Sequence, residues 1–245
     1  MTNINNIQWK RTAAEGVAVV VSILLAFWID TLWDGRQEAQ LETVYLLELQ
    51  EDFERNKSLL EDQAAELGET ARSMLVLQEQ STLETPSMSV SELNENFGQI
   101  LNMSSLFLVN RAYANMTGSG DLRIIRSRPL KNALAEYYAA ARVITLVQNT
   151  HEMELVQIYE PYIIENLDYA AVAVVRIDDF PLTPPVEVTS ILEVLATRKF
   201  RNILIQKSVI TTDLINEFRK QLELTDNVLR LLKLAHSEIT SEGSS

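Results

Sequence analysis

The sequence has no cysteine, little glycine or proline, and fewer basic than acidic residues. Without cysteine the chain cannot form disulfides, thiolate metal sites or cysteine nucleophiles. Its 7 glycines and 6 prolines in 245 residues favour long helices over a turn-rich β architecture. The 21 basic and 34 acidic residues give a net charge of −13, which leaves too few cations to follow a nucleic-acid backbone. We therefore expect an all-α protein that does not bind nucleic acid.

A long apolar run lies near the start of the chain. Residues 16–32 read GVAVVVSILLAFWIDTL, and residues 13–34 supply the roughly 20 residues with which a helix crosses hydrocarbon. A cleaved signal peptide is the main alternative, because Lys10 and Arg11 precede the run. No small-x-small cleavage site follows, since the next residues are bulky or polar, as Trp28 illustrates. We therefore predict a retained transmembrane helix in contact with membrane lipid.

The basic residues indicate the orientation of this helix. Lys10 and Arg11 precede it, whereas Arg36 is the only cation in the 20 residues that follow Trp33. Because basic flanks stay on the cytoplasmic side, we expect a single-pass protein of a bacterial inner membrane with its main domain in the periplasm. A cytoplasmic domain is the alternative. The predicted organisation is a short cytoplasmic N-terminus (1–12), a transmembrane helix (13–34), a helical soluble domain (35–236) and a disordered tail (237–245).

Small and polar residues recur every fourth position within the apolar run. Ala14, Ala18, Ser22, Ala26 and Asp30 share one helix face. Such a stripe allows a second helix to approach closely, and a partner or an interfacial position would relieve the cost of the Asp30 charge. We predict that this face pairs with a second copy of the chain or with a partner membrane protein; chance is the alternative, since alanine is common in apolar segments.

The rest of the chain has the periodicity of an elongated antiparallel helical bundle. The first helix continues past the apolar run with apolar residues at three-four spacing: Leu46, Leu49, Phe53, Leu60, Leu67 and Met74. Gly68 is its weak point, and a loop at 81–89 ends it. A capping box of Ser89 and Glu92 then opens a short helix to about Met103.

The middle of the chain contains a break and a long helix. Gly118 is predicted to cap a short helix, and Pro129 opens the next one. The apolar positions of the long helix are Leu134, Tyr137, Ala141, Ile144, Leu155, Ile158 and Tyr162. Gln148 and His151 occupy the missing core steps, which predicts a polar layer that specifies register or binds a small ligand or a proton. A His151 that is partly exposed or simply hydrogen-bonded is the alternative.

The C-terminal third gives weaker signals. Residues 170–186 fit a helix end or a buried extended segment equally well. Thr189 or Ser190 can cap a short helix to about Thr197. A last long helix is marked by Ile210, Leu214, Phe218, Leu222, Leu229 and Leu232, before a polar tail from Ser237.

Residues for catalysis are scarce. The chain has two histidines, His151 and His236, and neither has a glutamate three positions before it, which excludes the usual di-iron bundle site. The carboxylate pairs Glu51 with Asp52 and Asp178 with Asp179 lie in charge-rich stretches and are expected at the solvated surface. We predict no catalytic residue, no metal site and no cofactor.

Two stretches carry a resemblance to a known family. The apolar run with a Trp/Asp-rich edge is followed by Tyr45, Leu46, Leu49 and Asp52, and Tyr113 later precedes Gly120 and Leu122. With these motifs the first two thirds of the chain resemble a family of uncharacterised bacterial proteins with one N-terminal transmembrane helix. The resemblance implies an anchor followed by a helical domain and brings no activity.

Two functions fit these observations. The first is a non-enzymatic membrane-anchored scaffold or interaction protein that self-associates. The second is a periplasmic bundle that senses a ligand; because only about a dozen residues precede the span, it would signal through a partner membrane protein.

Overall fold

The computed structural model describes residues 4–101, 105–167 and 191–242, which contain helices and no strand. Its elements in chain order are α1 (Ile4–Gln80), α2 (Val90–Ile100), α3 (Arg111–Ser119), the 3-10 turn η1 (Asp121–Arg123), α4 (Arg128–Glu154), the π-helical turn η2 (Leu155–Tyr159), α5 (Glu160–Asn166), α7 (Ile191–Leu195) and α8 (Arg198–Glu242). The predicted all-α class is confirmed for these ranges. Residues 170–186, which the sequence left undecided, lie outside them.

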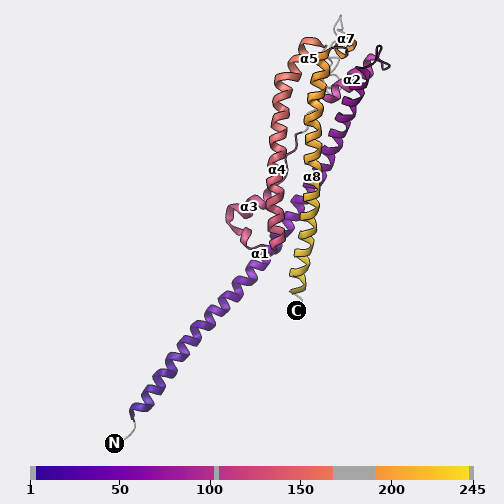
Figure 1. Ribbon diagram of the computed structural model, residues 1–245. Helices are drawn as coiled ribbons and strands as arrows, with labels where there is room; N and C mark the ends of the chain where they lie inside the picture. Colours follow the sequence, from indigo (N-terminus) through magenta and orange to yellow (C-terminus); the bar gives the residue numbers. More distant parts are fainter. Residues whose placement is uncertain (1–3, 102–104, 168–190, 243–245) are drawn as a thin grey trace, which may run out of the picture.

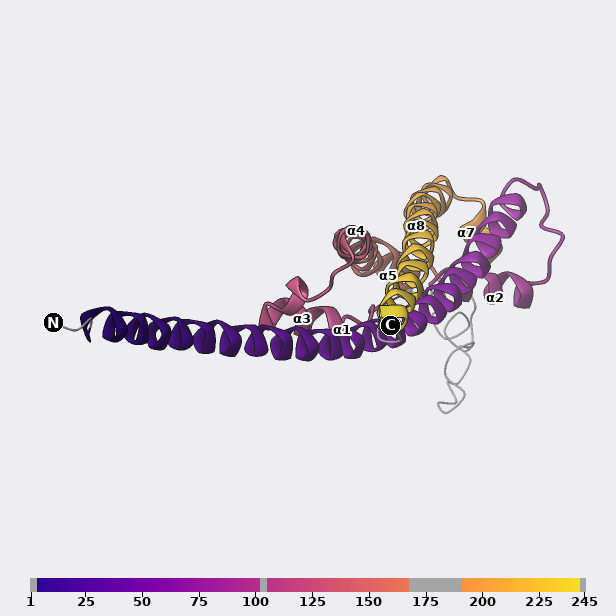
Figure 2. The same cartoon turned by 90° about the horizontal axis from the view of Figure 1, so that it is seen from below.

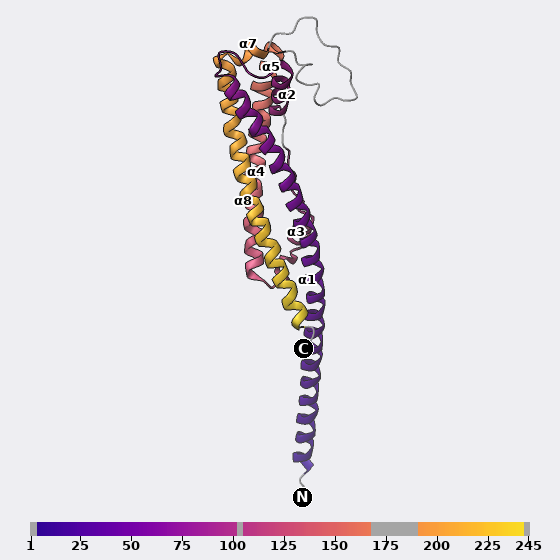
Figure 3. The ribbon, with the colours of Figure 1, turned by 90° about the vertical axis from the view of Figure 1, so that its right-hand side faces the viewer.

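Helix α1 connects the apolar run to the bundle without a break. It has 77 residues, and Gly68 does not interrupt it. Its first half projects away from the other described elements, while its second half forms part of the bundle (Figures 1 and 3). Among the described residues, one helix is long and apolar enough to span a membrane, and none of its apolar window is buried. The exposed apolar run and the bundle therefore share a single helix.

The bundle is formed by the second half of α1 together with α4 and α8, and α8 packs along both of the other helices (Figure 2). Helix α8 runs opposite to α1, and Lys57 of α1 binds Asp226 of α8 at 2.7 Å. It also runs opposite to α4, where His151 contacts Lys207. Helices α1 and α4 consequently point in the same direction (Figure 1). Helices α2, α5 and α7 lie at the end of this elongated core distant from the apolar run, and α3 lies beside α1 and α4 toward the other end (Figures 1 and 3).

Periodic apolar residues explain the packing of these helices. All six apolar residues predicted for α1 are buried, as expected for a stripe at three-four spacing. The prediction for the long helix is wrong within η2, where Tyr159 is buried and Leu155 and Ile158 are only partly buried, whereas the predicted Tyr162 after the turn is buried. A π-helical turn takes up an extra residue, and this shifts the phase of the buried face.

The helix ends confirm one predicted cap and correct another. The capping box is confirmed, because Ser89 N–H donates to Glu92 Oε2 at 2.8 Å and Glu92 N–H donates to Ser89 Oγ at 3.3 Å. Gly118, however, lies inside α3, and the cap is Gly120. Gly120 has φ of +80°, a left-handed conformation in which a Cβ is strained, so the backbone selects that glycine for the cap.

The C-terminal elements follow the prediction with two differences. Helix α7 ends at Leu195, and its predicted caps Thr189 and Ser190 lie outside the described residues. Helix α8 continues to Glu242, so the polar stretch after Ser237 is helical where a tail was predicted.

Candidate functional site

Within the described residues the bundle core is divided into three apolar clusters. From the far end of the bundle toward the apolar run, they centre on Met74 with Phe97 and Leu204, on Leu67 with Ile144 and Leu214, and on Phe53 with Tyr137 and Val228. Buried polar side chains lie between the clusters. We call them the His151 layer (Thr70, His151, Lys207 and Thr211) and the Asn56 layer (Asn56, Gln221 and Thr225). Each layer draws side chains from α1 and α8, and His151 comes from α4.

The Asn56 layer attaches a loop to α1. The Asn56 amide donates from Nδ2 to the carbonyl of Val109 at 2.8 Å, and Val109 N–H donates to Asn56 Oδ1 at 2.6 Å. Gln221 Nε2 donates to the carbonyl of Tyr137 at 3.3 Å. Because Asn56 satisfies both backbone groups of Val109, it holds residues 105–110 against the bundle.

The His151 layer is charged. His151 and Lys207 are 1% and 2% exposed, and Lys207 Nζ contacts His151 Nε2. The amine also lies 5.3 Å from the centre of the Tyr159 ring, whose hydroxyl donates to Glu154 Oε2 at 2.9 Å. A buried ammonium is thus placed against an imidazole and an aromatic face, a combination that is costly unless these groups stabilise it.

Burial and the nearby ammonium of Lys207 lower the pKa of His151 to about 4. The imidazole is therefore neutral at pH 7. Because an ammonium can only donate, Nε2 accepts from Lys207 and the ring proton lies on Nδ1. Nδ1 is buried and has no hydrogen-bond partner among the described residues. The layer thus contains two buried polar atoms without a hydrogen-bond partner among the described residues, His151 Nδ1 and Thr211 Oγ1, beside the amine of Lys207.

The helix changes its geometry just after this layer. The π-helical turn η2 begins four residues after His151 and ends at Tyr159, the ring that faces Lys207. Such turns are rare in proteins, and those that occur are often found at functional sites. The turn places an aromatic face where a regular helix would have placed Ile158.

Of the two residues predicted to form a polar layer, one lies in the core and the other does not. His151 lies in the core, whereas Gln148 is half-buried. Sequence reasoning missed Lys207, because lysine is almost always solvated. Its spacing was a usable signal, since Lys207 continues the three-four steps from Leu204 to Leu214.

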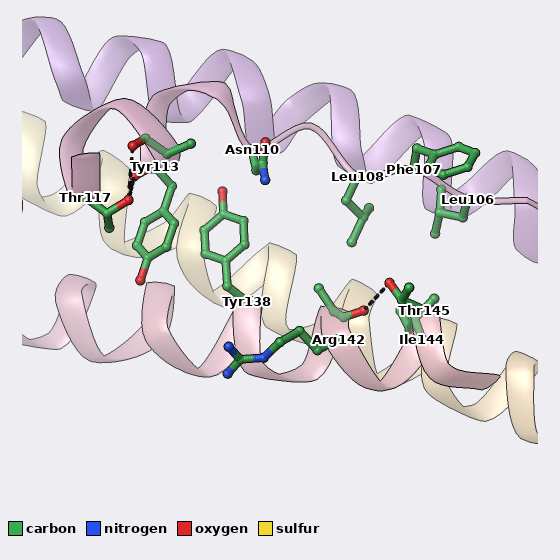
Figure 4. A pocket seen from close by; sticks show the side chains of 12 residues that line it. Leu106, Phe107, Leu108, Asn110, Tyr113, Thr117, Tyr138, Arg142, Ile144 and Thr145 are labelled. Atoms are coloured by element: carbon green, nitrogen blue, oxygen red, sulfur yellow. Dashed lines mark hydrogen bonds between the residues drawn. The ribbon is translucent and has the colours of Figure 1, made fainter. Parts of the chain in front are cut away.

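An open cleft of about 460 Å³ lies between the 105–110 loop, α3 and α4. Figure 4 shows the side chains that line it, with Leu108 and Ile144 in its apolar part. The rings of Tyr113 and Tyr138 stack at 4.1 Å between centres and form one end. Phe107 lies at the opposite end and is 84% exposed. The cleft therefore has a stacked pair of tyrosine rings at one end and a solvent-exposed phenylalanine ring at the other.

A buried carboxylate positions α3 at this cleft and corrects a prediction. Glu51 is at the surface as expected, but Asp52 is buried. Asp52 Oδ2 accepts from Ala112 N–H at 2.8 Å, and Oδ1 lies 3.3 Å from Arg111 Nη2. These contacts satisfy a donor in the first turn of α3, so Asp52 is buried because a partner distant in sequence covers it.

The remaining predicted site residues lie on the apolar part of α1. Ala14, Ala18, Ser22, Ala26 and Asp30 are all exposed on its projecting half, where Ser22 Oγ donates to the carbonyl of Ala18 at 2.8 Å. In the described ranges, no group of three or more histidine or acidic side chains is arranged to hold a metal ion.

Comparison of the chain with protein-family models, curated proteins and solved structures found no match. The resemblance based on Tyr45, Asp52 and Tyr113 therefore stays a prediction.

Proposed function

We propose that the protein is a non-enzymatic, membrane-anchored scaffold or interaction protein of the bacterial inner membrane. In this proposal residues 1–12 are cytoplasmic, residues 13–34 cross the bilayer, and the elongated antiparallel bundle stands in the periplasm. The observation that carries it is the continuity of α1, whose exposed apolar half leads directly into the packed half. A single helix transmits position and orientation from the membrane to the bundle without a flexible linker.

Self-association is supported by exposed apolar residues on two parts of the chain. The small-residue stripe from Ala14 to Asp30 offers a close helix contact in lipid. On the bundle, Val143, Leu146 and Met153 form an exposed stripe along α4. Anchored copies would be parallel and confined to the membrane plane, which raises the effective concentration of each stripe for its counterpart.

The absence of cysteine makes this proposal directly testable. Ser22→Cys places a thiol on the stripe, and Leu24→Cys places a matched thiol on the opposite face of α1. In oxidised native membranes we expect a disulfide-linked dimer from Ser22→Cys and little from Leu24→Cys. Equal crosslinking of both variants, or of neither, contradicts pairing through the stripe.

The same approach tests the topology. Ser81→Cys lies in the loop after α1, at the end of the bundle distant from the apolar run. A membrane-impermeant maleimide should label it in cells with a permeabilised outer membrane and an intact inner membrane. Labelling only after lysis of the inner membrane would place the bundle in the cytoplasm.

Ligand sensing is the second candidate, and the cleft favours it. Loops that line a cleft and rest on a buried polar contact are suited to respond to an occupant. In that case Asn56 and Val109 would link the 105–110 loop to α1, and α1 would carry the response toward a partner membrane protein.

A further inference from the structure

The cleft of Figure 4 differs in charge from the rest of the molecule. The chain has a net charge of −13, yet among the described residues no aspartate or glutamate lines the cleft. Arg142 is the one charged residue of the lining, and it makes no ion pair with the described residues. An anion that enters this cleft therefore meets an available guanidinium and no adjacent carboxylate.

A second polar group faces the cleft from the opposite wall. Asn110 is the N-cap residue of α3, a position where asparagine normally accepts a bond from the first turn of the helix. Its side chain makes no capping bond here, and Figure 4 shows it beside the Tyr113–Tyr138 end of the cleft. The amide is thus left available to an occupant, whereas Asp52 binds the nearby Ala112 N–H from outside the cleft.

The remaining surface suits an apolar body. Leu106, Leu108 and Ile144 form its buried or half-buried part, and Phe107 is exposed at the rim. A volume of about 460 Å³ is in the range of small-molecule sites, which are mostly apolar with a few placed polar groups.

We propose that the cleft binds a small amphipathic carboxylate. The apolar or aromatic body would lie against Phe107, Leu108 and Ile144, and the carboxylate would pair with Arg142. This binding site goes beyond the scaffold function and does not depend on it, since the cleft lies within the bundle of a single chain.

Phenylacetate is a suitable probe, with phenylacetamide as its uncharged counterpart. Binding is measured by saturation-transfer NMR and calorimetry on the full-length protein in an uncharged detergent. We expect phenylacetate to bind at least about tenfold more tightly than phenylacetamide, the scale of one charge-assisted hydrogen bond. No binding of phenylacetate up to millimolar concentration, or equal binding of both probes, overturns the proposal.

Variants locate the binding. Arg142→Gln should weaken phenylacetate about tenfold and leave phenylacetamide unchanged. Ala114→Trp, at an exposed position of the lining, should block both probes. Arg201→Gln removes an exposed arginine of α8 outside the cleft and should change neither. Wild-type affinity in both Arg142→Gln and Ala114→Trp would show that the probe binds elsewhere. The crosslinking of Ser22→Cys reports separately on the scaffold function.

Discussion

The Asn56 layer and the His151 layer interrupt the same core, but they compensate buried polarity in different ways. Asn56 pairs both of its amide atoms with the backbone of Val109. His151 shares its Nε2 with a buried lysine and leaves Nδ1 without a partner among the described residues. Asn56 thus forms neutral, matched hydrogen bonds, whereas the His151 layer contains a charge stabilised by its surroundings.

This difference separates a structural contact from a titratable one. Removing the Asn56 side chain leaves the N–H and carbonyl of Val109 without hydrogen-bond partners, and the free-energy cost of this loss does not depend on pH. The stability of the His151 layer depends on the protonation of one imidazole. The four predictions below test this contrast, and all of them use the full-length protein in a nondenaturing detergent.

Asn56→Ala should have the largest effect. It leaves the N–H and carbonyl of Val109 without partners and creates a cavity, so we expect the free energy of unfolding to fall by about 4 kcal/mol. Denaturant unfolding measures this change. Asn96→Ala is the control, because its amide donates to Glu92 on the exposed side of α2, and it should change stability by less than about 0.5 kcal/mol. A small loss in Asn56→Ala would mean that the loop is held by other contacts.

Acidification should destabilise the fold through His151. The pKa is about 4 in the folded protein and 6.5 as its ordinary value, so the unfolded state binds more protons between these pH values. The free energy of unfolding therefore falls as pH decreases from 6.5 toward 4, by up to about 3 kcal/mol, since each pH unit is worth about 1.4 kcal/mol.

The measurement compares denaturant unfolding of the wild type and His151→Gln over this pH range. In His151→Gln the free energy of unfolding should not show this decrease between pH 6.5 and pH 4. His236→Gln removes the other histidine and should show the same decrease as the wild type. If His151→Gln and the wild type lose stability in parallel, the imidazole is not the titrating group.

Lys207→Met should have a smaller effect of opposite sign. Methionine keeps much of the volume and removes the cost of a buried charge, so we expect the protein to gain about 1 kcal/mol. The pKa of His151, measured by NMR titration, should rise because the like charge of Lys207 contributes to its lowering. A strong loss of stability would show that the ammonium is a net stabilising member of the layer.

Gln221→Leu should have the smallest effect. The hydrogen bond of Gln221 to the Tyr137 carbonyl is 3.3 Å long, and its Oε1 is buried with no partner in the described residues. Replacing it by an apolar residue of similar size should change the free energy of unfolding by less than about 1 kcal/mol. A loss comparable to that of Asn56→Ala would mean that the whole Asn56 layer acts as one network.

The candidate sites were predictable only where they follow local periodicity. His151 was found because it occupies a core step of α4, and Lys207 occupies such a step in α8. The role of Asn56 could not be derived in this way, since its partner Val109 is 53 residues away. The cleft was not predictable either, because its walls come from a loop, α3 and α4 and meet only after the bundle has formed.

The sequence by itself determined the helical class, the position of the exposed apolar run and the buried stripe of α1. These properties depend on composition and on spacing along one helix, which are local. The tertiary structure alone decided that Asp52 is buried, that Gly120 and not Gly118 caps α3, and that Lys207 faces His151. Each of these outcomes depends on the backbone conformation or on a partner brought near by the packing of separate helices, and no local pattern encodes that proximity.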